Sequence, residues 1–483
     1  MNRPSTEAAG ARTATPGGPR PVRIWVLVTA LLTGCFAFQL NASMLSPALK
    51  SIQDSLGATS AEVGLTQTAF FTSAALFSLF LPRLGDLIGR RRVLAGMLAL
   101  MAVGCVMAAL AESIPVLFAG RVIQGVSGPT VPLCLIMLRN EVHEPKKYGT
   151  LLGVITAVNG GVAGVDSLAG GYLADHHGFQ AIFWAMAAVA ALATLLVATL
   201  TPESVAEDTE GRMDWAGVAL LVVSVGAALI ALNEAGKLAD ADWPLVGALF
   251  VVTAVAFALF WRTEDRGSHP LVATHHLRQR STWALLLTTV LTMTGVFAVM
   301  NGLIPAFAQD AQAGFGMTAE QSAWWTLIPY ALAGLAMGPI AGRLAATHGY
   351  GRILRLGLIG SAATLALMLL TLRADSRPLL LAASLLIGIT YAGVGNIVLN
   401  GLGIVLSPKE NPGFLPGLNA GAFNLGAGLS FALIYAAQTA AEPADKTSTT
   451  GYGAGVLTGA ALIAAAFATS FLIPKPVAAE AAP

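Results

Sequence analysis

Charged residues are scarce in this chain of 483 residues, since Asp, Glu, Lys and Arg together make up 11% of it. A soluble globular chain carries about a quarter of such residues, so this chain has too few polar groups to cover a surface that faces water. The formal net charge is +1, which gives no indication of a nucleic-acid partner. We therefore expect a protein solvated by a lipid bilayer.

Cysteine patterns and nucleotide-binding motifs are lacking as well. Cys35, Cys105 and Cys134 each lie inside an apolar run, and no CxxC or Cys/His spacing occurs, which argues against a disulfide framework or a zinc site. No G-x-x-x-x-G-K-[ST] loop, HExxH, Ser/His/Asp or paired-carboxylate arrangement is present. The sequence therefore predicts neither an enzyme nor a cofactor, and energy would come from an ion or substrate gradient or from a partner.

Apolar side chains are abundant instead, at 55% of the chain, and runs of about 20 recur along its length. Each run can cross a hydrocarbon core about 30 Å thick. The first run starts near Ile24 and is too long for a signal-peptide core, so it is read as a retained span. Fourteen spans are predicted, at about 24–46, 63–82, 93–112, 114–138, 148–173, 179–200, 214–234, 243–261, 282–308, 321–342, 353–372, 378–406, 413–437 and 452–473.

Lys and Arg predict the orientation of these spans. With a cytoplasmic N-terminus, cytoplasmic segments hold 21 of the 27 Lys and Arg residues, outer segments hold five, and Arg121 lies within a span. The positive-inside rule favours this orientation. We expect a multi-pass protein of the cell membrane with both termini cytoplasmic, the N-terminal residues 1–22 being disordered.

Two of the predicted cytoplasmic loops share a repeated sequence pattern. Residues 83–94 and 343–354 share Arg-Leu, Gly, Arg and Leu at the same spacing, with an offset of 260 residues. Duplicated helical bundles are common in secondary transporters, where the substrate site lies between the halves. The predicted fold is an all-α integral membrane protein of two six-helix bundles with two extra spans between them. The boundaries are 23–200 and 281–473 for the bundles, 201–280 for the linker with the inserted spans, and 474–483 for a cytoplasmic tail.

Three motifs resemble those of the major facilitator superfamily. The segment LPRLGDLIGRRRVL (81–94) resembles its loop motif G-x-L-a-D-r-x-G-r-k-x-x-l, and RVIQG (121–125) resembles the fourth-span motif R-x-x-q-G. The fourteen-span layout and QLNASMLSPAL (39–49) resemble the drug:proton antiporter branch. Two positions depart from that branch: Asn41 stands where its first-span acid is usual, and Asp166-Ser167 replaces the Gly-Pro of its fifth-span motif.

The loop motif implies a conformational latch at the cytoplasmic mouth. Carboxylate and guanidinium groups can pair when that mouth closes and separate when it opens. The alternative is that the arginines only fix topology. The residues assigned to the latch are Asp86, Gly89, Arg90 and Arg91.

Asp166 and Arg121 are ionisable side chains within predicted spans, which suggests function by default. The fourth and fifth spans form a hairpin around the loop near His143, so the two residues should lie at similar depth. We hypothesise that they pair and that Asp166 couples transport to protons or another ion. The alternatives are a structural salt bridge and a wet helix end.

Polar side chains in other spans are candidates for the wall of a substrate cavity. Asn159 and Asp166 lie two helical turns apart, and Asn396 and Asn400 lie one turn apart, so each pair shares a helix face. The alternative for each amide is an interhelical hydrogen bond that only holds the bundle together. The candidates are Asn41, Gln124, Asn159, Asn301, Tyr330, Asn396, Asn400, Asn419 and Asn424.

The resemblance implies a secondary transporter that exports a small organic molecule or drug in exchange for protons. Two alternatives stay open: a metabolite facilitator or symporter, which the departures at Asn41 and Asp166 would permit, and a non-transporting receptor on the same fold.

Overall fold

The computed structural model shows a chain whose described secondary structure is entirely helical. Thirteen helical stretches of it are long and apolar enough to cross a membrane. The predicted fifth span, 148–173, lies largely outside the described residues, although 164–177 are helical. The count of fourteen therefore stays a prediction. The structure describes residues 24–142, 144, 147, 151, 164–203, 213–235, 241–266, 274–374, 376–408, 414–442 and 448–475.

The described helices of the first half are α1 to α6 and α8. Two of its spans are interrupted by short 3₁₀ segments, η1 and η2. The bounds are α1 Ile24–Ser43, η1 Ser46–Ala48, α2 Leu49–Leu56, α3 Ser60–Ile88, α4 Arg90–Ala109, α5 Ile114–Gln124, η2 Gly125–Ser127, α6 Thr130–Glu141 and α8 Phe179–Leu200.

Two inserted helices, α9 (Trp215–Ala235) and α10 (Trp243–Arg266), follow the first half and pack against each other. Only 17% of the apolar window of α10 is buried inside the protein. Large apolar side chains such as Val251 and Phe257 are exposed on it. An exposed apolar surface of this extent suits lipid contact, which places α10 at the periphery of the bundle.

The second half runs from α12 to α20 after the short helix α11 (Thr274–Leu277). Three of its spans contain a π-helical segment, named η4, η5 and η6. The bounds are α12 Arg280–Ala298, η4 Val299–Leu303, α13 Ile304–Gln309, α14 Ala319–Ser322, η5 Ala323–Leu327, α15 Ile328–His348, α16 Tyr350–Ala374, α17 Arg377–Ile387, η6 Gly388–Asn396, α18 Ile397–Val405, α19 Phe414–Ala440 and α20 Thr450–Ser470.

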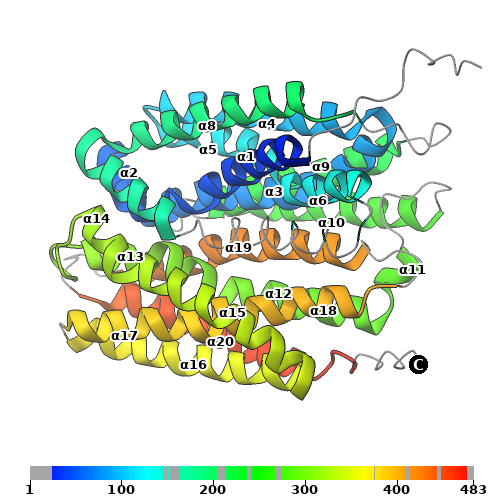
Figure 1. Cartoon of the computed structure of the whole chain (residues 1–483). Coiled ribbons are helices and arrows are strands. Elements are labelled where there is room, and N and C mark those ends of the chain that lie inside the picture. Colours follow the sequence, from blue (N-terminus) through cyan, green and yellow to red (C-terminus); the bar gives the residue numbers. More distant parts are fainter. Residues whose placement is uncertain are drawn as a thin grey trace, which may run out of the picture.

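The two halves lie one against the other, with α3 and α19 packed side by side between them (Figure 1). The Thr68 hydroxyl of α3 donates a hydrogen bond to the Gly428 carbonyl of α19 at 2.9 Å. A Cβ atom at Gly64 would lie 2.9 Å from Cβ and Cγ of Tyr435. Small residues thus allow close approach of α3 and α19.

The internal repeat is visible in the backbone. Gly89 between α3 and α4 and Gly349 between α15 and α16 both have positive φ, 106° and 93°. These are the glycines that the repeated loop aligns. A positive φ suits glycine because it lacks a Cβ atom. The backbone conformation therefore explains why glycine occurs at both positions.

A second repeat, which the loop comparison missed, lies at the opposite end of the bundle. Gly57 and Gly316 have φ of 62° and 59°. Each precedes by two residues a threonine that caps the next helix, Thr59 with Glu62 and Thr318 with Gln321. Both caps are capping boxes, in which two orphan backbone N–H groups are satisfied reciprocally.

Hydrogen bonds between the halves gather at the end of the bundle that holds α2 and α14, which the charge pattern predicts to be the outer end (Figure 1). The Asp175 carboxylate accepts hydrogen bonds from the backbone N–H groups of Ala319, at 2.9 Å, and Glu320, at 2.8 Å. The Gln309 amide donates to the Pro47 carbonyl at 2.9 Å. The structure is therefore a conformation in which the halves are joined at this end.

Candidate functional site: two buried polar clusters and the faces between the halves

Arg121 lies at the centre of a polar cluster inside the first half. Its side chain is fully buried. One terminal guanidinium nitrogen donates to Oε1 of Gln124 at 2.6 Å and the other to Oε1 of Gln67, and both lie 3.3 Å from the Asn41 carbonyl. The guanidinium carbon stands 4.2 Å from the centroid of the Phe70 ring, within cation–π range. The cluster joins α1, α3 and α5 around one cation.

Asn41 extends this cluster to α4. Its amide nitrogen donates to the Ala37 carbonyl at 2.9 Å, and its amide oxygen accepts from the Cys105 thiol at 3.3 Å. Asn41 and Gln124 are fully buried. In this conformation both amides hold helices together, as in the alternative stated for each amide, and a role in lining the substrate cavity stays a prediction.

Asp166 forms the second cluster, where the helical residues 164–177 meet the end of α1. The Ser43 hydroxyl donates to one carboxylate oxygen, and Ser167 lies 3.4 Å from the other. Asp166 is 2% exposed, so the expectation of a wet helix end is wrong. A carboxylate buried in a span is costly, so such a residue usually has a polar partner and often marks a functional site.

The predicted pair between Arg121 and Asp166 does not form among the described residues. Arg121 contacts α1 at Asn41, whereas Asp166 contacts it at Ser43. Arg121 donates to the backbone carbonyl of Asn41, whereas Asp166 accepts from the side-chain hydroxyl of Ser43, so the two groups bind α1 through different atoms. Depth in the membrane, which the sequence can predict, does not decide the direction in which a side chain points.

The second half carries uncharged polar groups on its irregular segments. Asn301 lies on η4, and its amide donates to the Phe297 carbonyl at 3.0 Å. Tyr330 follows η5, and its ring lies nearly parallel to that of Tyr391 on η6, with 6.5 Å between centroids. Single π-helical turns are frequent at functional sites, and irregular backbone at membrane depth is tolerated where it is buried in protein or lines a cavity. These segments are the best candidates for the second-half wall of a substrate site.

The remaining amide candidates divide into two kinds. Asn400 is exposed and donates to Oδ1 of half-buried Asn396 at 2.7 Å, which agrees with their predicted common face. Asn419 is fully buried, accepts from Thr289 at 2.7 Å and donates to the Leu399 carbonyl at 3.2 Å. Asn419 therefore joins helices. Asn424 is half-buried on α19, and Asn159 lies outside the described residues.

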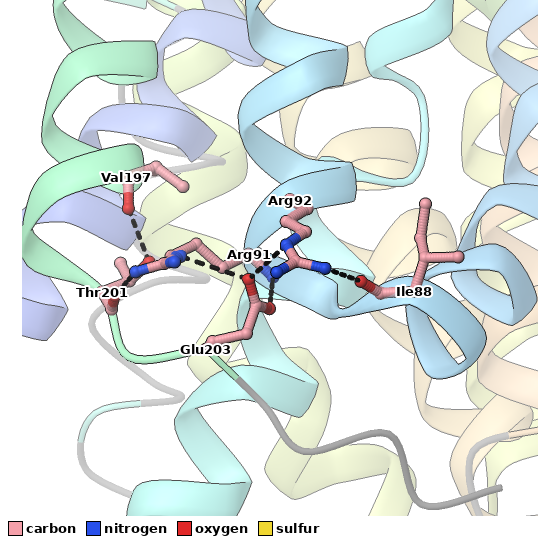
Figure 2. A network of polar contacts seen from close by, with 6 residues as sticks. All are labelled: Ile88, Arg91, Arg92, Val197, Thr201 and Glu203. Atoms are coloured by element: carbon pink, nitrogen blue, oxygen red, sulfur yellow. Dashed lines mark hydrogen bonds and ion pairs between the residues drawn. The ribbon is translucent and has the colours of Figure 1, made fainter. Parts of the chain in front are cut away.

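The loop between α3 and α4 holds the predicted latch, and three of its ion pairs with described partners lie within the first half. Asp86 pairs with Arg90 one helical turn later, at 2.8 Å. Glu203, just after α8, accepts from the backbone N–H of Arg91 at 3.2 Å and from its Nε at 3.3 Å, and lies 3.5 Å from Nε of Arg92 (Figure 2). In this conformation the network ties the loop to the end of α8.

Gly89 has a second reason to be glycine in this network. A Cβ atom there would lie 2.5 Å from Oε1 of Glu203, closer than atoms normally pack. The positive φ disfavours a larger residue, and a Cβ atom would also displace the Glu203 carboxylate from its contacts with Arg91.

Neutralising Glu203 tests the network. We expect Glu203→Gln to lower transport severalfold, because an ion pair that is partly exposed contributes up to about 1 kcal/mol, which is about a fivefold change in a two-state equilibrium. Initial transport rates per folded molecule measure the effect. Asp265→Asn, which removes the carboxylate of the Arg278 pair at 3.1 Å, is the matched control and should keep the wild-type rate. Equal rates for both variants would contradict a role of the network in transport.

The sequence did not indicate four residues that the structure adds as functional candidates: Gln67, Ser43, Asp175 and Glu203. Each acts through a partner that is distant in sequence, Glu203 for example lying 112 residues from Arg91. The capping box at Thr318 marks a helix start in the sequence, yet nothing there places Asp175 against it. A carboxylate directly after a span and opposite an arginine-rich loop is the one signal that could have indicated Glu203.

A pair of helical halves with a repeated backbone pattern, polar groups between spans and contacts at one end is the architecture of a secondary transporter. The profile of the Major Facilitator Superfamily matches residues 31–431. The chain belongs to this superfamily, which confirms the resemblance carried by its motifs, and it is a multi-pass integral membrane protein.

Individual proteins show which members of the superfamily this chain is similar to. The chain is 53% identical over 455 residues to the uridine/deoxyuridine transporter of Lactococcus lactis subsp. cremoris (strain MG1363), covering 93% of this chain and 95% of that protein. It is 25% identical over 425 residues to the tetracenomycin C resistance and export protein of Streptomyces glaucescens, covering 87% and 77%. A mutant of the nucleoside transporter NupG has a TM-score of 0.65 at 14% identity, covering 93% of this chain and all of that one. The last likeness shows the fold alone.

Proposed function

We propose that this protein moves a pyrimidine nucleoside, of the uridine and deoxyuridine kind, across the cell membrane by alternating access between its two halves. The observation that carries the proposal is the 53% identity, over nearly the full length of both chains, to a uridine/deoxyuridine transporter. The orientation with both termini in the cytoplasm is part of the proposal and rests on the distribution of Lys and Arg.

The chemistry of the second-half segments supports this substrate class. Asn301, Tyr330 and Asn396 are uncharged polar groups, and a nucleoside is uncharged near neutral pH. Carboxamides can donate to and accept from the imide edge of uracil, as amide side chains do with base edges elsewhere. Aromatic rings such as those of Tyr330 and Tyr391 offer stacking surfaces, and stacking on a base contributes about 1–3 kcal/mol.

Drug efflux, which the resemblance to the antiporter branch implied, is replaced by this proposal. The relative named for export shares 25% identity, whereas the uridine/deoxyuridine transporter shares 53%. The departures at Asn41 and Asp166 also separate the chain from the antiporter pattern. Asp166, the buried carboxylate between α1 and the fifth span, is the proposed site of coupling to protons.

The test is counterflow of labelled uridine in proteoliposomes, with unlabelled deoxyuridine, adenosine or a cationic drug inside. We expect exchange with deoxyuridine and none with the drug. Asn301→Ala should reduce uridine exchange about tenfold, in line with the loss of a hydrogen bond in a buried site, while Asn140→Ala, an exposed amide at the end of α6, should not. Exchange with the drug but not with deoxyuridine would overturn the nucleoside proposal, and uridine binding without flux would favour a receptor.

A further inference from the structure

The hydroxyl of Ser43, at the last residue of α1, lies between two acceptors. It donates to Asp166 and also lies 3.0 Å from the backbone carbonyl of Gln39. The Gln39 amide nitrogen donates to the Ser43 oxygen at 2.8 Å. A hydroxyl has one hydrogen to donate and two lone pairs, so Ser43 cannot donate to both acceptors at once.

The protonation state of Asp166 decides between the two acceptors. When Asp166 is ionised, the carboxylate takes the Ser43 hydrogen, because hydrogen bonds to a charged acceptor are the stronger ones. When Asp166 carries a proton, its own O–H can donate to the Ser43 oxygen, and the Ser43 hydrogen can turn to the Gln39 carbonyl. The hydrogen of each hydroxyl group has an acceptor in both states, and the proton count balances.

This contact stands beside the part of α1 that meets the second half. Met44 follows Ser43, and its carbonyl oxygen touches Gly170, one turn after Asp166. Three residues later the Pro47 carbonyl accepts the hydrogen bond from Gln309 of the second half. The fifth span itself reaches the second half through Asp175. Both partners of the Ser43–Asp166 bond thus continue directly into contacts that close the predicted outer end.

We propose that Ser43 is a positioning residue whose hydroxyl switches between Asp166 and the Gln39 carbonyl, and so transmits proton binding from the fifth span to the end of α1. The inference rests on the proposed transport function and identifies the proton as the coupling ion. With Asp166 ionised, a charge-assisted bond holds α1 to the fifth span. With Asp166 protonated, a weaker neutral bond replaces it, and the contacts that join the halves at this end separate more easily.

Other charged groups on the elements packed here do not contact Asp166 in the described structure. The α1 and η1 segments contain no charged residue between Ile24 and Leu49. Asp175 and Glu320 lie further toward the end of the bundle, and Arg121 donates to the side-chain oxygens of Gln124 and Gln67. We therefore expect the pH dependence of transport to follow from Asp166 and the two serine hydroxyls beside it, those of Ser43 and Ser167.

The experiment compares uridine-driven proton movement and the pH profile of uridine transport in proteoliposomes. Ser43→Ala removes a donor to the ionised carboxylate, which favours the protonated form, so the midpoint of the pH profile should move up by about one unit. Ser43→Thr keeps the hydroxyl and should restore the wild-type profile. Asp166→Asn should lose proton movement and pH dependence while it still exchanges uridine. Ser46→Ala, at a buried serine three residues along, is the matched control and should match the wild type.

An unchanged midpoint in Ser43→Ala, or an equal shift in Ser46→Ala, would overturn the switch. Proton movement that survives in Asp166→Asn would overturn the coupling site. If Ser43→Ala fails to fold, Ser43→Cys, a weaker donor, should give an intermediate shift, and no shift would count against the proposal. Uridine exchange needs no proton gradient, so its absence in the wild type would overturn the nucleoside proposal separately.

Discussion

Replacement of Gly170 by alanine should reduce transport at least tenfold and lower the yield of folded protein. A methyl group at this position would overlap the carbonyl oxygen of Met44 and lie 3.0 Å from its carbonyl carbon. A backbone carbonyl cannot rotate away as a side chain can, so the end of α1 must shift. Overpacking of this kind costs about 1–3 kcal/mol, and occasionally more. The shift would also separate Ser43 from Asp166.

Gly421→Ala is the matched control for this substitution. Gly421 also lies in a membrane helix, α19, and a Cβ atom there meets nothing within 4 Å. Helix propensity favours alanine over glycine equally at both positions, so the difference between the two variants isolates the contact with Met44. Folded yield from size-exclusion chromatography and initial uridine transport per folded molecule are the measurements. Similar values for the two variants would mean that α1 and the fifth span are not held together at Gly170.

The architecture could be predicted from the sequence because its signals are local. The apolar runs gave spans whose described counterparts are helices, as in Phe179–Leu200 against the predicted 179–200. The repeated loop residues likewise contain Gly89 and Gly349, whose positive φ values show the same turn in both halves. Hydropathy and residue spacing are properties of a single segment, so they can be used without knowledge of the three-dimensional structure.

The contacts of the site could not be predicted, because they depend on how each helix is rotated about its axis. Similar depth along the membrane normal does not bring Arg121 and Asp166 together, because Arg121 donates to the Asn41 carbonyl whereas Asp166 accepts from the Ser43 hydroxyl. Pro305 and Pro329 follow η4 and η5 by two residues, but η6, which carries Tyr391, contains no proline that would mark it in the sequence. Hydropathy cannot distinguish an amide that joins helices, such as Asn419, from one that faces a substrate.

Substitution of Arg121 should have the other large effect. We expect the conservative replacement Arg121→Lys to destabilise the protein at least as much as the apolar replacement Arg121→Met. Arg121→Met leaves the buried oxygens of Gln67, Gln124 and Asn41 without the donors that now satisfy them. Each buried acceptor left unpaired costs about 1–3 kcal/mol, so the three together cost about 3 kcal/mol or more before any compensation. Removal of a buried charge offsets part of it.

Arg121→Lys keeps the buried charge but loses the planar fork that reaches several acceptors at once. An ammonium group is compact and more strongly hydrated than a guanidinium group, so its burial stays costly while fewer oxygens are satisfied. We therefore expect Arg121→Lys to be as unstable as Arg121→Met, or less stable, in thermal unfolding of the detergent-solubilised protein. Arg373→Met, at an exposed arginine near the end of α16, should leave stability unchanged. If Arg121→Lys kept wild-type stability and transport while Arg121→Met lost both, the charge itself would be the essential feature, and the hydrogen-bonded cluster would not explain the residue.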